Sequence, residues 1–208
     1  MTLPKIAFMI PAYGSISIPA WQSHINLVAN ANRFCVPAII TATSCYVNAS
    51  RNRLLEKFRE ADRLTNFDYI IWIDSDIVFS WQDCNKIVES LKNNRAHVLT
   101  GLYFNFIDHK LTPMLNDYNI EEDRYTTSEL QGKSRHVDSA GLGFTIQTGA
   151  SLRKMMGDHG IDFFGFRKSK HGKLIGEDNL FFEFAKKSGF QPWVDETVRV
   201  GHAKLVSV

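Results

Sequence analysis

A short apolar run that ends directly at two acidic residues constrains the fold of this chain more than any other stretch. Residues 69–73 read YIIWI and are followed by Asp74, Ser75 and Asp76. A run rich in β-branched isoleucine, bounded by acids on both sides, predicts a strand buried on both faces of a sheet. Such a strand belongs in the middle of the sheet. The two acids would then lie at the C-terminal edge, where open α/β folds bind their ligands.

The pair Asp74 and Asp76 has two interpretations. Carboxylate oxygens are hard ligands suited to Mg²⁺ or Mn²⁺, and an ion held by one or two carboxylates completes its shell with water and substrate phosphates. Alternatively, Asp74 begins a turn and Asp76 caps the next helix. This stretch alone leaves both interpretations open.

The rest of the chain alternates between strand-like and helix-like segments. Apolar strand runs at 5–11, 36–41, 69–73 and 97–104 are separated by helical patterns at 19–32, 48–63 and 81–94. This alternation predicts an α/β fold with a mostly parallel central sheet and right-handed crossovers. Periodicity fades over 105–135, which we expect to form either a mobile excursion or a small accessory hairpin. Two further strands are expected at 191–195 and 198–202.

Length and composition set the broad class. A chain of 208 residues with 44% hydrophobic content predicts one domain, 1–208, with a substantial core. The net charge of +2 is too balanced to indicate nucleic acid or an acidic membrane by itself. Cys35, Cys45 and Cys84 have no CxxC spacing, so neither a disulfide framework nor a zinc cluster is implied. Without a signal peptide or an apolar run long enough to span a membrane, we expect a soluble, cytoplasmic protein.

Four other features suggest a site. Arg51 is expected in the first turn of the helix at 48–63, where the helix dipole disfavours a cation unless an anionic partner compensates; a solvated arginine is the alternative. Gly141 and Gly143 alternate before a strand, which often marks close approach of another group. Glu177 and Asp178 begin a predicted helix, where capping alone would explain Asp178. His202 follows the last strand, and a lone histidine is more often structural than a ligand.

Together these pieces resemble the GT-A type of nucleotide-sugar-dependent glycosyltransferase, particularly small family-2-like members of bacteria and bacteriophages. The resemblance spans most of the chain and predicts a Rossmann-like three-layer sandwich. It rests on six motifs in the family's order: Ile10-Pro11-Ala12-Tyr13, Ala49-Ser50-Arg51-Asn52, Asp74-Ser75-Asp76 as the DxD motif, Gly141-Leu142-Gly143-Phe144, Gly176-Glu177-Asp178 and Gly201-His202.

The resemblance implies a role for each motif. Asp76 would bind the Mn²⁺ or Mg²⁺ ion that bridges the donor diphosphate, Asp74 would touch the donor or the metal shell, and His202 would be a further metal ligand. Asp178 matches the acid that deprotonates the acceptor hydroxyl in inverting members, and Glu177 precedes it in the same catalytic motif. The donor-binding positions are Pro11, Ala12, Tyr13, Arg51, Asp74, Gly141 and Gly143.

The resemblance thus implies a hexosyl- or pentosyltransferase that uses a nucleoside-diphosphate sugar. The acceptor is a glycan precursor, a protein, or a hydroxymethylated base in phage DNA; a phage enzyme would act in the host cytoplasm. The basic run at 167–173, directly before Glu177, gives the DNA hypothesis thin physical support, and a solvated loop explains the same residues. Compared with fuller family members, we expect this chain to act without an added acceptor domain or membrane anchor.

Two rival functions fit part of the pattern. Haloacid-dehalogenase-like phosphatases also place DxDx[TV] after a strand, and residues 74–78 satisfy that motif with Asp74 as nucleophile. In that family, however, the motif usually follows the first strand, whereas here two strand-helix units precede it. The other rival is a sugar-nucleotide-binding module without turnover. Retention of every expected polar position argues mildly against it.

Overall fold

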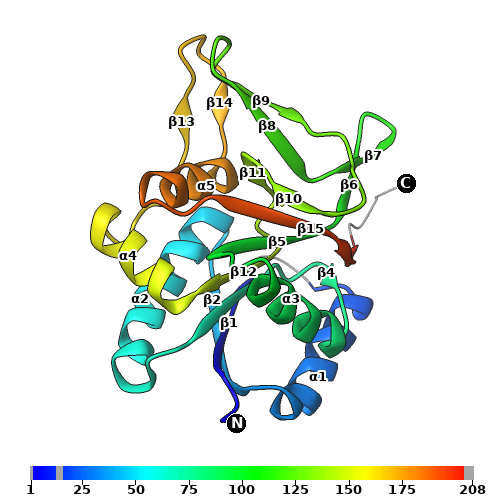
Figure 1. Ribbon diagram of the computed structural model, residues 1–208, viewed down its shortest axis with the longest axis vertical. Coiled ribbons are helices and arrows are strands. Elements are labelled where there is room, and N and C mark those ends of the chain that lie inside the picture. The colour runs from blue at the N-terminus through cyan, green and yellow to red at the C-terminus, as the bar shows by residue number, and fades with distance from the viewer. Residues whose placement is uncertain (1, 13–15, 204–208) are drawn as a thin grey trace.

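The computed structural model describes residues 2–12 and 16–203, so the predicted donor-binding residue Tyr13 lies outside the described residues. A seven-stranded sheet lies between two layers of helices (Figure 1). The helices are α1 (Ile18–Asn30), α2 (Val47–Thr65), α3 (Trp81–Asn93), α4 (Gly149–His159) and α5 (Glu177–Lys187), with a short 3-10 helix at Ala31–Arg33. Helices α2, α4 and α5 cover one face of the sheet, and α1 and α3 cover the other.

The central sheet has the order β10-β15-β5-β12-β3-β1-β2. Its strands are β1 (Lys5–Ala12), β2 (Val36–Thr43), β3 (Tyr69–Ile73), β5 (Val98–Leu102), β10 (Ser134–His136), β12 (Phe144–Thr148) and β15 (Pro192–Arg199). Strands β15, β5, β3, β1 and β2 run in one direction, while β10 and β12 run in the other. The sheet is therefore mostly parallel, as the alternation of strands and helices predicts.

Strand β3 is central and is buried on both faces, as its sequence predicts. Ile70 and Trp72 enter the core beneath α2, α4 and α5, whereas Ile71 and Ile73 enter the core beneath α1 and α3. None of these four side chains is more than 1% exposed. Burial of such side chains stabilises the fold by about 1.5–3 kcal/mol each. The end of β3 is thus a rigid support for the residues that follow it.

The remaining strands form small sheets around this core. They are β4 (Ile77–Val78), β6 (Phe104–Ile107), β7 (Lys110–Pro113), β8 (Leu115–Asn119), β9 (Arg124–Thr127), β11 (Ser139–Ala140), β13 (Arg167–Lys168), β14 (Leu174–Ile175) and β16 (Gly201–His202). Two hairpins, β6–β7 and β8–β9, occupy most of the segment 104–127. The hairpins β8–β9 and β13–β14 extend from the same end of the molecule, above α5 (Figure 1).

Three details differ from the sequence-based expectation. The two closing strands are one long strand, β15, with a register shift between Asp195 and Arg199, followed by the two-residue β16. Strand β12, which follows the glycine motif, enters the sheet antiparallel between β3 and β5. In α1 the apolar residues at helical spacing are not buried in the core, since Trp21 and Val28 are 53% and 59% exposed and line an open apolar cavity. That helix packs through Ala20, Ser23, His24 and Leu27 instead.

No helix within the described ranges is long and apolar enough to cross a bilayer. The three cysteines are free thiols, and two of them, Cys35 and Cys84, are buried.

Candidate functional site

The acidic motif after β3 lies in a tight turn at the C-terminal edge of the sheet. The Asp74 carbonyl accepts a hydrogen bond from the Ile77 N–H at 3.1 Å, and the Asp74 N–H donates to the Gly143 carbonyl at 3.0 Å. Asp74 therefore does begin a turn, as one interpretation expects. The cap interpretation of Asp76 is wrong, because α3 begins at Trp81 and its N-cap is Ser80. The Asp76 side chain therefore does not cap a helix.

Arg51 is the centre of an ion-pair cluster. Its Nη2 donates to both carboxylate oxygens of Asp74 at 3.0 Å, and its Nη1 contacts Glu177 at 3.3 Å and also Asp178. The side chain is only 2% exposed, so the solvated arginine considered from the sequence is wrong. Helix α2 starts at Val47, which places Arg51 just beyond the first turn. The anionic partners that compensate its charge are three acids of this chain.

The cluster carries an excess of negative charge. In the described part of the chain, Asp74, Glu177 and Asp178 contact a single buried cation, Arg51, and the Asp76 carboxylate lies near Asp74. Burial raises the pKa of the Asp74, Glu177 and Asp178 carboxyls, and Arg51 only partly offsets this shift. A site of this charge favours a cation as an additional partner.

Asp76 and His202 lie beside this cluster, and the arrangement of their side chains shows whether a metal ion could bind there. The Nε2 atom of His202 is 3.0 Å from Oδ2 of Asp76, and Oδ1 of Asp76 is buried without a partner within the described residues. The His202 Nδ1 is 3.3 Å from the Phe104 carbonyl, a contact that leaves the Nε2 lone pair available when Nδ1 carries the proton. Two neighbouring ligands of an octahedral ion with bonds of about 2.1 Å are themselves about 3.0 Å apart. The pair therefore fits a hard divalent ion.

Within residues 2–12 and 16–203, no group of three or more His, Cys, Asp or Glu side chains is gathered as a metal site. Asp74, the third predicted ligand, turns its carboxylate to Arg51 instead. The protein thus offers Asp76 and His202, and a Mg²⁺ or Mn²⁺ ion held by so few protein ligands takes the rest from water and substrate phosphates.

The glycine motif is a place of close approach, as the sequence predicts, and the approaching group is Tyr103. A Cβ atom on Gly141 would lie 2.0 Å from the Tyr103 hydroxyl, and one on Gly143 would lie 3.0 Å from it and 3.1 Å from Oδ2 of Asp74. The Gly143 N–H donates to the Tyr103 hydroxyl at 3.2 Å, and the Tyr103 ring meets the His202 ring edge to face. Burial raises the pKa of Tyr103 well above its ordinary value, so the phenol is neutral.

Sequence reasoning does not identify Tyr103, although its position at the end of the strand at 97–104 is a usable signal. That position brings it to the same edge of the sheet as Asp74. The tyrosine joins the glycine motif to the histidine of the proposed metal pair.

A mostly apolar cavity of about 340 Å³ adjoins the acidic motif between α1 and strands β1 and β2. Ala12, a predicted donor-binding residue, and Ser75 of the acidic motif line it; Pro11 is buried and is not among the lining residues. His24 also lines it, is 8% exposed, and has no hydrogen-bond partner for either ring nitrogen in the described part of the chain. Burial lowers the pKa of His24, so its imidazole is neutral. No sequence signal singles out this residue.

No protein-family model matches the sequence, and a search of the curated proteins finds no match. Many solved structures resemble the fold, among them the following two. "A197 from STIV" has 21% sequence identity and a TM-score of 0.59, with 97% of this chain and 86% of that chain covered. "GalNAc-T7 with UDP, GalNAc and Mn2+" has 8% identity and a TM-score of 0.62, and the match covers 99% of this chain but only 44% of that one.

Similarity at these identities shows the fold alone. The architecture is the GT-A type expected from the motifs, with its mostly parallel central sheet. Neither comparison of sequences supports membership of family 2 or a bacteriophage origin.

Proposed function

We propose that this protein is a metal-dependent glycosyltransferase that moves a sugar from a nucleoside-diphosphate sugar to a hydroxyl acceptor. The observation that carries the proposal is the gathering of Asp74, Asp76, Asp178 and His202 near the end of β3 on a GT-A fold, where Asp74 and Asp178 contact buried Arg51 and Asp76 pairs with His202. These residues are far apart in the sequence. A structural role alone does not require so many acids around one cation.

In this proposal Asp76 and His202 hold a divalent cation. Imidazole suits Mn²⁺ better than Mg²⁺, and the neighbour GalNAc-T7 was solved with UDP, GalNAc and Mn²⁺. When bound, the ion supplies positive charge that stabilises the departing nucleoside diphosphate. In this proposal Asp74, whose carboxylate is held by Arg51, contacts the donor or a water of the metal shell.

The cavity beside Ser75 is the proposed place for the nucleoside of the donor. Its volume of about 340 Å³ and its apolar lining are suited to a flat heterocycle. His24 lines the cavity, and both of its ring nitrogens are buried without a partner in the described residues. We propose that the imidazole turns one of these nitrogens toward the edge of that heterocycle, because an unsatisfied buried polar atom costs about 1–3 kcal/mol. Ala12 lines this part of the proposed donor site, whereas buried Pro11 does not. Gly141 and Gly143 contribute by leaving room for the Tyr103 ring, which a Cβ at either position would meet.

Asp178 is the proposed general base. It takes the proton of the acceptor hydroxyl while that oxygen bonds to the anomeric carbon and the bond from this carbon to the diphosphate breaks. Its raised pKa, caused by burial, makes the carboxylate a stronger base than an exposed aspartate. Glu177 and Arg51 position it, since Arg51 contacts both acids from the side. Arg51 is also a candidate for contact with the donor diphosphate once the acids rearrange.

The phosphatase alternative is less compatible with this geometry. Asp74, its nucleophile, has both carboxylate oxygens bound to Arg51 Nη2 at 3.0 Å, an arrangement that lowers its nucleophilicity. The GT-A architecture is also a different fold from the one that alternative requires.

The free cysteines favour a reducing compartment such as the cytoplasm.

The test is to incubate the protein with Mn²⁺, a panel of nucleotide sugars, and acceptors that include small glycans, a protein and hydroxymethylcytosine DNA, and to follow sugar transfer by mass spectrometry. We expect metal-dependent transfer or donor hydrolysis that Asp76→Ala abolishes. Tight donor binding without turnover for every acceptor would instead identify a sugar-nucleotide-binding module. Hydrolysis of a generic aryl phosphate in the absence of nucleotide sugar would identify a phosphatase.

A further inference from the structure

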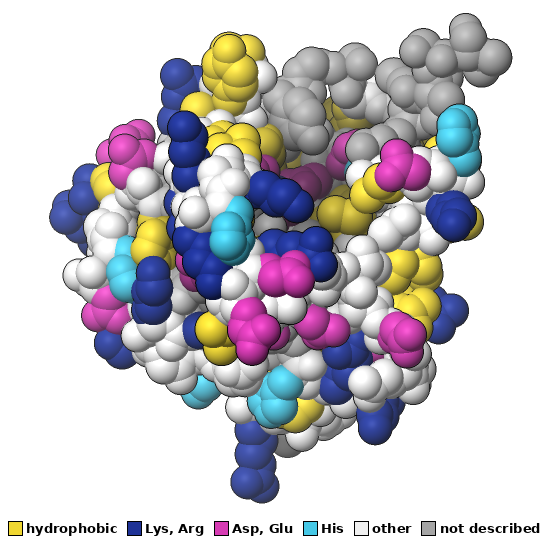
Figure 2. Space-filling view, turned by 90° about the horizontal axis from the view of Figure 1, so that it is seen from above, with side chains coloured by type: hydrophobic (Ala, Val, Ile, Leu, Met, Phe, Trp, Pro, Cys, Tyr) yellow, Lys and Arg dark blue, Asp and Glu magenta, His cyan; other side chains and the backbone are white. Residues whose placement is uncertain are grey.

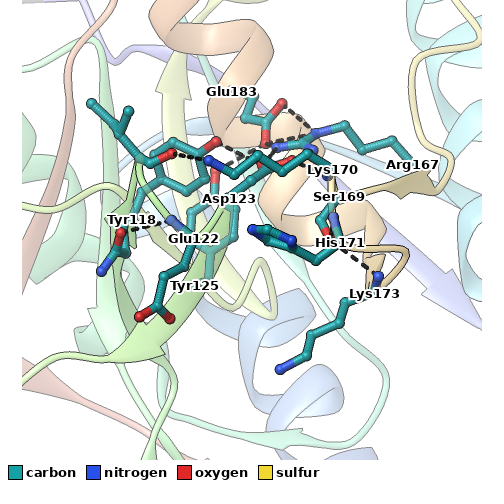
Figure 3. Close-up of polar contacts among 12 residues, drawn as sticks. Tyr118, Glu122, Asp123, Tyr125, Arg167, Ser169, Lys170, His171, Lys173 and Glu183 are labelled. Carbon is teal, nitrogen blue, oxygen red and sulfur yellow. Dashed lines mark hydrogen bonds and ion pairs between the residues drawn. The ribbon is translucent and has the colours of Figure 1, made fainter.

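The two hairpins above α5 are fastened together by a polar clasp. Arg167 of β13 donates from Nη2 to Asp123, beside β9, at 3.0 Å and to Glu183 of α5 at 2.7 Å (Figure 3). Tyr118 donates its hydroxyl to Asp123 at 2.7 Å, and Tyr125 donates to Glu183 at 3.1 Å. The hairpins and α5 therefore hold one another in place. We call β8–β9 and β13–β14 together the hairpin arm, residues 115–127 and 167–175.

The tip of the hairpin arm carries lysines that take no part in these ion pairs. Arg167 is paired with Asp123 and Glu183, but Lys168, Lys170 and Lys173 make no ion pair within the described residues. The Lys170 N–H donates to Asp123 at 2.6 Å, which fixes the backbone of the tip while its ammonium contacts only a carbonyl, that of residue 120. Figure 3 shows Lys173 extending away from the clasp.

The facing tip adds little opposing charge. Glu122 pairs with Arg124 there, which leaves Glu121 as its exposed acid. His171 lies between Lys170 and Lys173 and is also exposed. Seen from above, Lys and Arg side chains gather over this end of the molecule, beside a hollow with acidic side chains in its depth (Figure 2).

A cavity beside this basic tip reaches Asn179 in the first turn of α5, the turn that also carries the proposed base; Asp178 itself does not line the cavity. This cavity, of about 250 Å³, lies between β9 and β14; its lining includes Arg124, Lys173 and Leu174 and extends to Asn179. Asn179 is the neighbour of Asp178 in the first turn of α5. Leu174 and Phe166, at the bases of the tip, are 67% and 51% exposed, so apolar surface lies beside the lysines. Lysines combined with exposed aromatic and apolar side chains suit a strand of nucleic acid, whose phosphates and bases they contact respectively.

We infer that the hairpin arm binds the phosphodiester backbone of a nucleic-acid acceptor and leads one of its nucleotides toward Asp178. This inference rests on the proposed function, because the arm's role as an acceptor site requires Asp178 to be the base. The rigid clasp sets the distance between the lysines and α5. The three lysines of the tip carry the contact with phosphate, and Phe166 and Leu174 provide the surface for a base.

The test uses the full chain and a fluorescently labelled oligothymidylate, followed by anisotropy without donor or metal. Three phosphate contacts at a slope of about −0.7 each predict a log-log salt slope of about −2, so wild-type affinity should fall roughly 20-fold between 50 and 200 mM salt. Replacing Lys168, Lys170 and Lys173 by Ala should weaken binding roughly tenfold or more at 50 mM salt and flatten the slope. Thermal melting verifies that this variant is folded.

A matched triple variant removes Lys86, Lys92 and Lys154, which pair with acids on α3 and α4, and should bind as the wild type does. Equal affinity of the wild type and the arm variant, or binding to phosphatidylglycerol vesicles and not to oligothymidylate, would overturn the inference. Mn²⁺-dependent donor hydrolysis by the wild type is measured separately. Its absence would count against the proposed function, whereas the anisotropy result judges the arm alone.

Discussion

Replacing Arg51 by methionine should destabilise the fold strongly at neutral pH. The arginine is 2% exposed and is the one cation that contacts Asp74, Glu177 and Asp178 in the described structure. Methionine keeps the apolar stem against the Phe164 ring, whose centroid is 5.7 Å from the guanidinium carbon. What is lost is therefore the charge and its hydrogen bonds. Removing one partner of a buried ion pair costs about 3–5 kcal/mol.

The loss should depend on pH. Burial already raises the pKa of all three acids, and removing Arg51 raises these values further. A carboxyl whose folded-state pKa is raised stabilises the fold fully below its unfolded value, near 4, and loses that contribution as the pH rises through the folded value. The variant should therefore be penalised more at pH 7 than at pH 5, where protonation neutralises part of the acid cluster.

Urea unfolding followed by tryptophan fluorescence measures this difference, and thermal melting should show a fall of roughly 6–20 °C. Arg53→Met is the matched control, because Arg53 lies on the same helix, is exposed, and donates only to the Thr43 carbonyl. It should cost no more than about 0.5 kcal/mol. Arg51→Lys should lie between the two, since an ammonium keeps the charge without the planar fork. An Arg51→Met protein as stable as the wild type at pH 7, or a loss that is equal at both pH values, would refute the reasoning.

Four further changes test other parts of the site. Asp178→Asn should lower the transfer rate by about 10²–10⁴-fold while donor affinity is kept. In the wild type, the acid limb of the pH–rate profile should lie above the ordinary aspartate pKa of about 4, because burial raises the pKa of Asp178. A loss of donor affinity equal to the loss of rate would contradict the role of Asp178 as base. His202→Ala should weaken Mn²⁺ binding, and an unchanged titration would make the residue structural. His24→Phe should lower nucleotide affinity in calorimetry without unfolding the protein, whereas unchanged affinity would remove His24 from the donor site. Gly141→Ala should destabilise the protein in urea, because the added Cβ would lie 2.0 Å from the Tyr103 hydroxyl. Gly157→Ala is the control: a Cβ there meets open space, and the change should stabilise the protein by about 0.5–1 kcal/mol. Equal effects of the two changes on stability would exclude the close-approach explanation.

The sequence predicts the frame of this protein well because its strongest signals are local. The apolar run before Asp74 can be buried only as a central strand, and the glycines before β12 mark a close approach that the structure attributes to Tyr103. The alternation of strands and helices likewise predicts the layers. The antiparallel insertion of β12 has no such signal, since strand direction depends on how distant segments pair.

The site is less predictable because its contacts join distant parts of the chain. Arg51 meets Asp74 across 23 positions and Asp178 across 127, so its helix alone gives no indication of these partners. The apolar stripe of α1 shows that helical spacing alone does not reveal which face of a helix packs against the sheet. Helical spacing identifies Trp21 and Val28 as one face, but tertiary packing places Ala20 and Leu27 against the sheet instead. His24 becomes notable only once the cavity exists.

The central claim is that Asp76 and His202 hold a divalent ion for a nucleoside diphosphate. The most direct measurement is electron paramagnetic resonance of free Mn²⁺ titrated with the protein, with and without UDP, GDP or dTDP. We expect that the wild type binds Mn²⁺, that at least one of these nucleotides tightens the binding, and that Asp76→Ala abolishes both effects in a folded protein. If Asp76→Ala titrates Mn²⁺ as the wild type does, with the same dependence on nucleotide, then Asp76 does not hold the ion.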